Sequence, residues 1–320
     1  MTADLAGILT YGSFFLVTAL SYAILCLGLN LQWGHTGLFN VGIAGFVAIG
    51  GYTSAILTTP ASDQHLGGFG LPIAVGWIAA MVTAGLASAL VGALTLRLRS
   101  DYLAITTFGV AVVIHLVALN AQRLTGGPFG IGFIPRPFGD LADKPLLFTG
   151  LNLALVAAIL LVLALGLERL LHGPWGRVLR AIREDEKAAE ALGKSPVRLR
   201  LEAFTLGGAI MGLAGAVHGH FIGFIAPDNY QSGLTFQVWA MLIVGGAGNS
   251  RGAVIGAVIV WGLWSVSGLA IGGLFPPADQ ARASSLQLVA IGSMLVAMLL
   301  FRPGGILGER TIVSRWVKQR

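Results

Sequence analysis

Residues 173–202 read GPWGRVLRAIREDEKAAEALGKSPVRLRLE and form the one long, densely charged segment of the sequence. Apolar runs flank this segment on both sides, and each is long enough for a helix of about 20 residues that crosses a bilayer. Loops rich in Lys and Arg remain on the cytoplasmic side of a membrane. We therefore predict that residues 173–202 form a cytoplasmic loop between two spans, where a helix is well sited to meet a soluble partner.

The composition of the whole chain is typical of a membrane protein. Of its 320 residues, 55% are hydrophobic and 11% are charged, and the mean hydropathy is +0.81. Soluble domains have about a quarter of their residues charged. The net charge of +6 gathers in the central loop and in the tail 310–320, which is the pattern of cytoplasmic loops and predicts no nucleic-acid partner. The single cysteine, Cys26, allows no intrachain disulfide and no cysteine metal cluster.

The apolar runs predict an all-α, polytopic transmembrane bundle of about eight to ten spans. The candidate spans are 8–30, 36–58, 71–96, 103–121, 149–171, 200–225, 234–248, 252–272 and 285–301. The seventh is short enough to be re-entrant, and the second is rich enough in Gly to be broken. With the charged loop inside, the C-terminus is expected inside and the N-terminus outside. No cleaved signal peptide is expected, because residues 1–12 carry an acid and no base.

Two Gly-rich interruptions stand in roughly corresponding places in the two halves of the chain. They are WGHTGLFNVGIAGFVAIGG at 33–51 and VGGAGNSRGAVIG at 244–256. Paired interruptions of this kind can mark a permeation path at a repeat interface. Close helix packing through small residues is the alternative, and the sequence leaves both open. If there is such a path, we predict that it is lined, around the first interruption, by Asn30, Thr36, Gly37, Asn40 and Gly45.

The charged segment itself has the pattern of a short amphipathic helix. Apolar residues from Trp175 onward recur at helical spacing, and Arg, Glu and Lys fill much of the other face. Pro174 suits the start of this helix and Gly193 its end. A helix lying in lipid headgroups and a helix docking onto a partner explain the pattern equally well. Next to the loop, Glu202 is expected to pair with Arg198 or Arg200.

Several strings resemble a known family. AAEALG at 188–193 matches the core of the permease docking signature Glu-Ala-Ala-x-x-x-Gly, although Lys187 stands where the signature has Glu. The longer string GRVLRAIREDEKAAEALG at 176–193 resembles the corresponding loop of branched-chain amino-acid ABC permeases of the LivM type. Four further blocks resemble the same family in the same order, at 28–55, 102–131 (ending in TGGPFGI), 213–230 and 301–308 (FRPGGILG).

The resemblance implies the membrane subunit of an importer, with residues 1–320 as one permease domain and 173–200 as its ATPase-docking loop. The docking residues it implies are Arg180, Arg183, Glu184, Asp185, Glu186, Ala188, Ala189 and Gly193. It also implies a homologous second permease of the LivH type, two ABC ATPase subunits, a periplasmic substrate-binding protein and a location in the bacterial inner membrane. The substrates implied are branched-chain or other hydrophobic amino acids; urea, short amides and aromatic acids are alternatives. The chain itself is expected to be no enzyme and to carry no cofactor, because ATP and Mg²⁺ are bound by the ATPase subunits.

Other chemistry is poorly supported by the residues. LGKSP at 192–196 resembles the end of a phosphate-binding loop, but Ala188 stands where that loop needs Gly. His218 and His220 lie two positions apart on a predicted helix and so do not share a face for a metal ion. A secondary transporter would need a carboxylate at membrane depth, and the predicted spans offer almost none. A membrane enzyme would need a nucleophile and base, and the sequence shows no such motif.

Overall fold

The computed structural model describes residues 2–62, 65–98, 100–272, 275, 280–302 and 304–309, and all structural statements concern these residues. Their long helices are α1 (Thr2–Leu29), α2 (Ile43–Thr58), α3 (Ile73–Thr95), α4 (Ser100–Asn120), α6 (Pro145–His172), α9 (Pro196–Ile222), α10 (Ser232–Gly245), α11 (Ser250–Gly272) and α12 (Gln280–Phe301). Short helices and helical turns are α5 (Gln122–Thr125), α7 (Pro174–Glu184), α8 (Glu186–Ala191), η1 (Asn30–Gly34), η2 (Gly127–Phe129), η3 (Gly139–Leu141) and η4 (Pro227–Tyr230). Each predicted span overlaps one long helix, so the all-α prediction is confirmed.

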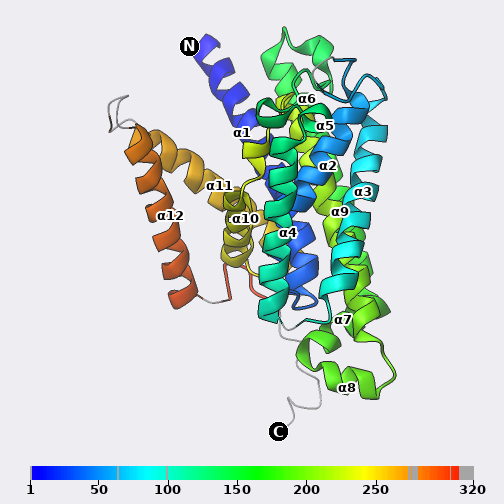
Figure 1. Ribbon diagram of the computed structural model, residues 1–320. Helices are drawn as coiled ribbons and strands as arrows, with labels where there is room; N and C mark the ends of the chain where they lie inside the picture. The colour runs from blue at the N-terminus through cyan, green and yellow to red at the C-terminus, as the bar shows by residue number, and fades with distance from the viewer. Residues whose placement is uncertain are drawn as a thin grey trace.

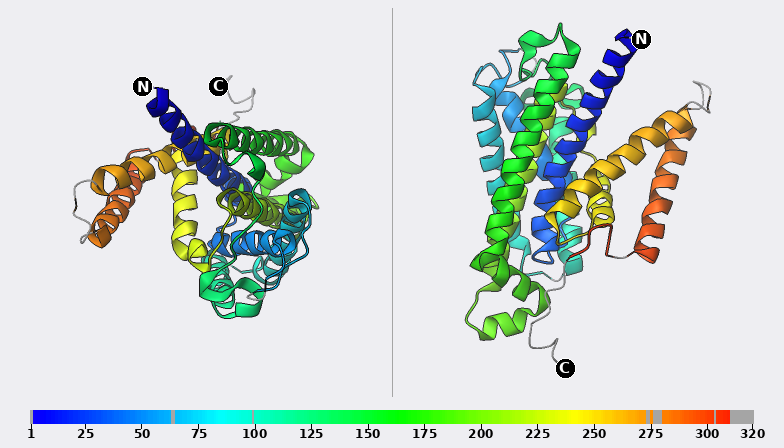
Figure 2. Two further views of the ribbon diagram at one scale, coloured as in Figure 1. Left: turned by 90° about the horizontal axis from the view of Figure 1, so that it is seen from above. Right: turned by 180° about the vertical axis from the view of Figure 1, so that it is seen from behind.

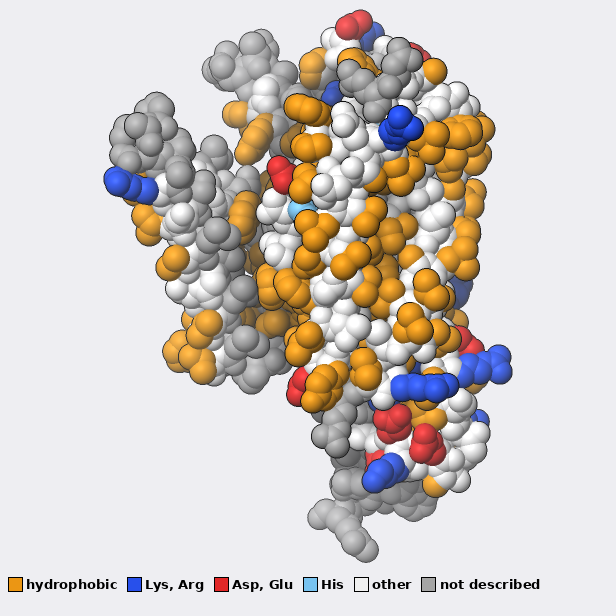
Figure 3. Space-filling view, viewed as in Figure 1, with side chains coloured by type: hydrophobic (Ala, Val, Ile, Leu, Met, Phe, Trp, Pro, Cys, Tyr) orange, Lys and Arg blue, Asp and Glu red, His pale blue; other side chains and the backbone are white. Residues whose placement is uncertain are grey.

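Six of these helices are long and apolar enough to cross a membrane. They are α1 continued through η1 (Gly7–Gly34), α3, α4, α6, α9 and the Ser250–Gly268 part of α11. The helices α2 and α10 are apolar but shorter, as expected for segments next to the two Gly-rich interruptions. Figure 3 shows hydrophobic side chains along the outer faces of the long helices, while many of the charged ones gather near α7 and α8. The protein is therefore a multi-pass membrane protein.

The helices α1 and α9 form the centre of the bundle. In their most apolar windows, 72% and 67% of residues are buried, against 22–28% in α3, α4, α6 and α11. Glycines allow this close packing: a Cβ on Gly50 of α2 would lie 2.2 Å from the carbonyl oxygen of Gly212 in α9. Such contact through small residues holds helices together in lipid, where there is no hydrophobic drive between them. The interpretation of Gly as a packing residue is confirmed for this pair.

The ends of the bundle differ in what they carry. α7 and α8 project from one end, and α1 begins at the opposite end, together with the loop between α4 and α6 (Figure 1). α11 packs against α1 and α10, and its far part leaves the bundle and forms a hairpin with α12 (Figure 2). Glu309, near the end of the described chain, lies beside α7. The predicted cytoplasmic charges at 310–320 fall outside the described residues.

Candidate functional site: a junction between the charged loop and two helix breaks

The charged loop folds into two helices, and the prediction of a single helix from Pro174 to Gly193 is wrong. Asp185 separates α7 from α8 with an extended backbone (φ −148°, ψ 103°). Its carboxylate accepts a hydrogen bond of 3.0 Å from the backbone N–H of Ala188, which makes it the N-cap of α8. The predicted ends are confirmed, since Pro174 stands in the first turn of α7 and Gly193, at φ 74°, follows α8.

One face of α7 packs tightly against the spanning helices. Gly176, Leu179 and Ile182 are buried on this face. A Cβ on Gly176 would lie 2.1 Å from the carbonyl oxygen of Leu171 in α6, so no larger residue fits without displacing the helix. Trp175 donates a 3.0 Å hydrogen bond from Nε1 to Glu202 at the start of α9. α7 is thus held between the ends of α6 and α9.

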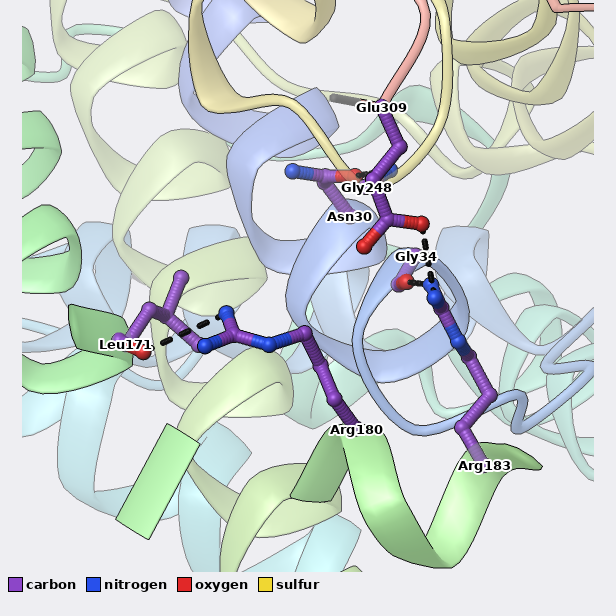
Figure 4. Close-up of polar contacts among 7 residues, drawn as sticks. All are labelled: Asn30, Gly34, Leu171, Arg180, Arg183, Gly248 and Glu309. Carbon is purple, nitrogen blue, oxygen red and sulfur yellow. Dashed lines mark hydrogen bonds and ion pairs between the residues drawn. The ribbon is translucent and has the colours of Figure 1, made fainter. Parts of the chain in front are cut away.

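Two arginines of α7 reach toward the interior of the bundle (Figure 4). Arg183 donates to the carbonyl oxygen of Gly34, the last residue of η1, and forms a 2.6 Å ion pair with Glu309. Arg180 donates a longer bond of 3.4 Å to the carbonyl oxygen of Leu171. Because Gly34 lies at the first Gly-rich interruption, Arg183 connects the charged loop directly to a break in the central helix.

The two Gly-rich interruptions meet at the same place. The side-chain oxygen of Asn30 accepts a 2.8 Å hydrogen bond from the backbone N–H of Gly248, in the break between α10 and α11. Gly246 and Gly248 have φ values of 106° and 82°, a left-handed conformation that strongly favours glycine. Leu307, within the predicted C-terminal block, donates its backbone N–H to the carbonyl oxygen of Gly245 at 3.0 Å. Segments far apart in the sequence therefore form one junction.

Of the five residues predicted to line a path around the first break, Gly37 is exposed and the other four are buried. Asn40 donates a 2.7 Å bond to the Gln32 side chain, and Thr36 bonds to the Gln32 carbonyl oxygen. Gly37 lies beside the Arg183 side chain, and Gly45 packs against α4. With Asn30 bonded to Gly248, each of the five has a close neighbour in the chain. Their role in translocation remains a prediction.

Gln32 is a residue of the junction that the sequence interpretation missed. Its side chain is fully buried, donates 2.8 Å to the carbonyl oxygen of Phe204 in α9 and accepts from Asn40. It therefore joins η1, the following break and α9. The available signal was the cost of an amide in an apolar span, which usually means that the group has a specific partner.

A polar cavity of about 260 Å³ lies beside the junction. It is lined by His35, Glu168, Leu171, His172, Arg180, Gly248, Asn249, Ser250, Arg251 and Glu309. His35, just after the span that ends at Gly34, is 4% exposed, and neither ring nitrogen has a hydrogen-bond partner among the described residues. Burial, followed by the positive charges of Arg180 and Arg183 and a smaller contribution from His172, lowers the pKa of His35 to about 4. The imidazole is therefore neutral at physiological pH.

The predicted docking residues divide into two groups. Glu184, Asp185, Ala188 and Gly193 are exposed at the tip of the loop. The remaining four turn inward: Arg180, Arg183 and Glu186 are half-buried, and Ala189 is 4% exposed. Leu192, which the prediction omitted, is 79% exposed beside Gly193.

Two ion pairs lie at the start of α9. Arg198 pairs with Glu202 at 3.1 Å, which confirms one of the two expected partners of Glu202. Arg200 pairs with Glu186 of α8 at 2.8 Å instead. The second pair spans the turn between α8 and α9, so it holds α8 in place against the spanning helix.

The fold is that of a multi-pass membrane protein, and its charged loop is bonded to the break at the end of α1, beside the break between α10 and α11. The chain matches the family described as the permease component of the branched-chain amino acid transport system over residues 12–299. The chain belongs to that family.

Relatives extend this result. The chain is 36% identical over 312 residues to the high-affinity branched-chain amino acid transport system permease protein LivM of Escherichia coli, a match that covers 89% of this chain and 67% of the relative. It is 24% identical over 297 residues to LivH of Salmonella typhimurium, covering 90% and 92%. It is 29% identical over 227 residues to the guanosine ABC transporter permease protein NupQ of Bacillus subtilis, covering 66% and 67%. No solved structure matches significantly.

Proposed function

We propose that this chain is the LivM-type permease of an ABC importer that carries branched-chain or other hydrophobic amino acids across the bacterial inner membrane. The observation that carries the proposal is the bond from Arg183 of the charged loop to Gly34 at the helix break. The family match and the 36% identity to LivM support the substrate class. The guanosine permease is less similar and matches less of the chain, so nucleosides are a weaker second candidate.

The proposed complex contains a second permease, two ABC ATPases and a periplasmic binding protein. Similarity to LivH as well as LivM supports a pair of homologous permeases. The end with α7 and α8 faces the cytoplasm in this proposal, because loops rich in Arg and Lys stay there. The binding protein then docks at the opposite end. ATP and Mg²⁺ belong to the ATPase subunits, and residues 173–200 act as the coupling loop of one permease domain.

In this proposal the loop transmits movement from an exposed side, which contacts the ATPase, to an inner side, which bonds to the helix breaks. The exposed side, with Glu184, Ala188 and Leu192, contacts the ATPase. On the inner side, Arg183 bonds to Gly34 at the first break. Asn30, next to that break, in turn bonds to Gly248 at the second break. A ligand or partner shifts a conformational equilibrium only as far as it binds the two states differently. ATPase closure would supply that difference by pulling α7 and therefore η1.

A reconstituted transport assay tests the proposal. The complex, with its binding protein and with ATP on the cytoplasmic side of proteoliposomes, is expected to accumulate leucine, isoleucine and valine in preference to guanosine, urea or aromatic acids. Uptake of guanosine alone would move the assignment to the second candidate. Uptake that persists without ATP and collapses with the proton gradient would overturn the importer.

A variant of the loop tip tests the docking role. Ala188→Arg places a bulky cation on the exposed side, and it is expected to reduce recovery of the ATPase subunits with the tagged permease at least tenfold. Arg123→Gln, an exposed change in the loop between α4 and α6 at the other end, serves as the control and keeps the ATPases bound. Full recovery of the ATPases with Ala188→Arg would contradict docking at this surface.

A further inference from the structure

A second cavity, of about 180 Å³, lies within the bundle between α1, α2, α9 and α10. Tyr22 of α1 lines it and stands twelve residues before Gly34, a rise of about 18 Å along the helix. A bilayer core is about 30 Å thick, so the cavity lies near its middle. Secondary transporters bind their substrates at this depth. The cavity is separate from the polar cavity of the junction.

Several polar side chains that line this cavity have no hydrogen-bond partner within the described chain. Among the described residues, the hydroxyls of Tyr22 and Tyr230, the imidazole of His218 and the carboxamide of Asn229 make no hydrogen bond within the chain. Polar groups in a membrane interior are costly when nothing bonds to them. Asn229 is exposed, but the other three residues are buried or half-buried. Three such groups around one cavity point to an occupant that supplies the missing donors and acceptors.

A nearby histidine outside the cavity lining, His220, does have hydrogen-bond partners in the chain. His220, two residues after His218, bonds to the Ser54 hydroxyl at 2.8 Å and to the Pro135 carbonyl oxygen at 2.7 Å. His218 instead faces the ring of Tyr22, with ring centroids 6.2 Å apart. The prediction that the two histidines do not share a face is confirmed. One histidine is a structural link, and the other is left free in the cavity wall.

The rest of the wall is apolar and carries no formal charge. Leu25, Val47 and Leu234 supply aliphatic surface from α1, α2 and α10. The described lining includes no Asp, Glu, Lys or Arg. An occupant with a net charge would be buried without a counter-ion, which is strongly unfavourable. The wall therefore suits a ligand that is net neutral, polar at one end and aliphatic at the other.

We propose that this cavity is a membrane subsite for a zwitterionic α-amino acid with a short aliphatic side chain. The proposal rests on the proposed function and deepens it. An apolar cavity of roughly 150 Å³ holds a benzene molecule, so the cavity here accommodates a branched aliphatic side chain and disfavours a nucleoside. The free hydroxyls of Tyr22 and Tyr230 and the imidazole of His218 bond to the ammonium and carboxylate groups. Uncharged donors and acceptors hold a zwitterion loosely enough for it to leave, as transport requires.

The cavity is also connected to the junction. Tyr22 and Leu25 lie on α1, which continues into η1 and ends at Gly34, the residue bonded to Arg183. A pull of α7 on η1 therefore moves the cavity wall along the same helix. Binding-site geometry then depends on the state of the loop.

The first test uses the two histidines as a matched pair in the reconstituted complex with its binding protein. His218→Gln is expected to lower leucine uptake about tenfold, because a bond to the substrate is lost, while ATPase activity stimulated by the binding protein persists. His220→Gln is expected to lower thermal stability and to leave uptake per folded complex unchanged. Tyr22→Phe is expected to act like His218→Gln. Normal uptake in both His218→Gln and Tyr22→Phe would overturn the subsite.

The second test changes the size of the cavity. Ala214→Leu, in the wall contributed by α9, fills part of the space and is expected to lower the leucine-to-alanine uptake ratio at least tenfold. Val47→Ala enlarges the space and is expected to raise uptake of phenylalanine relative to leucine. If Val47→Ala leaves the phenylalanine-to-leucine uptake ratio unchanged and His218→Gln takes up leucine normally, the subsite is overturned while the proposed function stands. Failure of the unmodified complex to transport any amino acid would instead overturn the proposed function.

Discussion

The junction and the mid-membrane cavity both place polar side chains inside an apolar bundle, yet their bonding differs. At the junction, Asn30, Gln32 and Arg183 each bond to a backbone atom of another element. In the cavity, Tyr22 and His218 have no such bond. Polar groups bonded to backbone fix the positions of the elements they connect. Groups left free are available to a molecule that arrives and departs. In our proposals, the difference separates a part that transmits movement from a part that binds the substrate.

The largest expected effect comes from breaking the junction at Arg183. Arg183→Glu removes the bond to Gly34 and places a second carboxylate beside Glu309, so α7 no longer holds the break. We expect leucine uptake to fall about 100-fold, while ATPase activity and membrane levels persist, because the loop loses both its ion pair and its bond to the helix break. Transport and ATPase assays on the same proteoliposomes measure this uncoupling.

A charge swap sharpens this prediction. Arg183→Glu combined with Glu309→Arg restores the ion pair but not the bond to the Gly34 carbonyl. We expect the swap to recover only a small part of the uptake. Full recovery would show that the charge pair alone carries the coupling and that the contact with the break is dispensable. The related reversal of Arg183 together with Glu186 also breaks the pair with Arg200, so it is expected to abolish uptake.

The second prediction concerns the backbone conformation of the break between α10 and α11. Gly246→Ala adds a Cβ at φ 106°, 2.6 Å from the carbonyl oxygen of Leu307. We expect a loss of about 1–3 kcal/mol in stability, seen as a lower melting temperature in detergent and a severalfold lower yield. Gly233→Ala in α10 is the control, because its Cβ meets nothing within 4 Å. Equal melting temperatures for the two variants would contradict the packing at this break.

The third effect concerns His35, the exception at the junction because its ring has no partner. The pKa of His35 is lowered to about 4 from an unfolded value of about 6.5, so the unfolded chain binds the proton more tightly. The stability from the neutral ring is complete above pH 6.5 and is lost as the pH falls toward 4. At pH 5 the loss is about 2 kcal/mol. We expect melting temperature to drop between pH 7.5 and 5, and less so in His35→Gln. Parallel curves for the two proteins would refute the role of His35.

The sequence predicted the elements better than it predicted their contacts. Runs of apolar residues identify spanning helices because the bilayer imposes a length, and each predicted span overlaps a helix. Asp185 was missed as a boundary because helical periodicity continues across it, although Asp is a preferred N-cap. The bond between Asn30 and Gly248 joins residues 218 positions apart, which no local pattern encodes. Tyr22 looked like part of an apolar run, and His218 was considered only as a metal ligand.

The smallest expected effect distinguishes the junction from the exposed surface of the same loop. Arg198 and Glu202 form an ion pair at 3.1 Å, but the Arg198 side chain is 81% exposed. Exposed pairs contribute about 0–1 kcal/mol because water screens them and two long side chains lose freedom. We therefore expect Arg198→Gln to leave uptake within about twofold of the unmodified complex, measured beside Arg183→Glu. A large loss in Arg198→Gln would mean that loop charge in general drives coupling. A small loss of uptake in Arg198→Gln together with a large loss in Arg183→Glu would assign the coupling to Arg183, the residue that reaches the helix break.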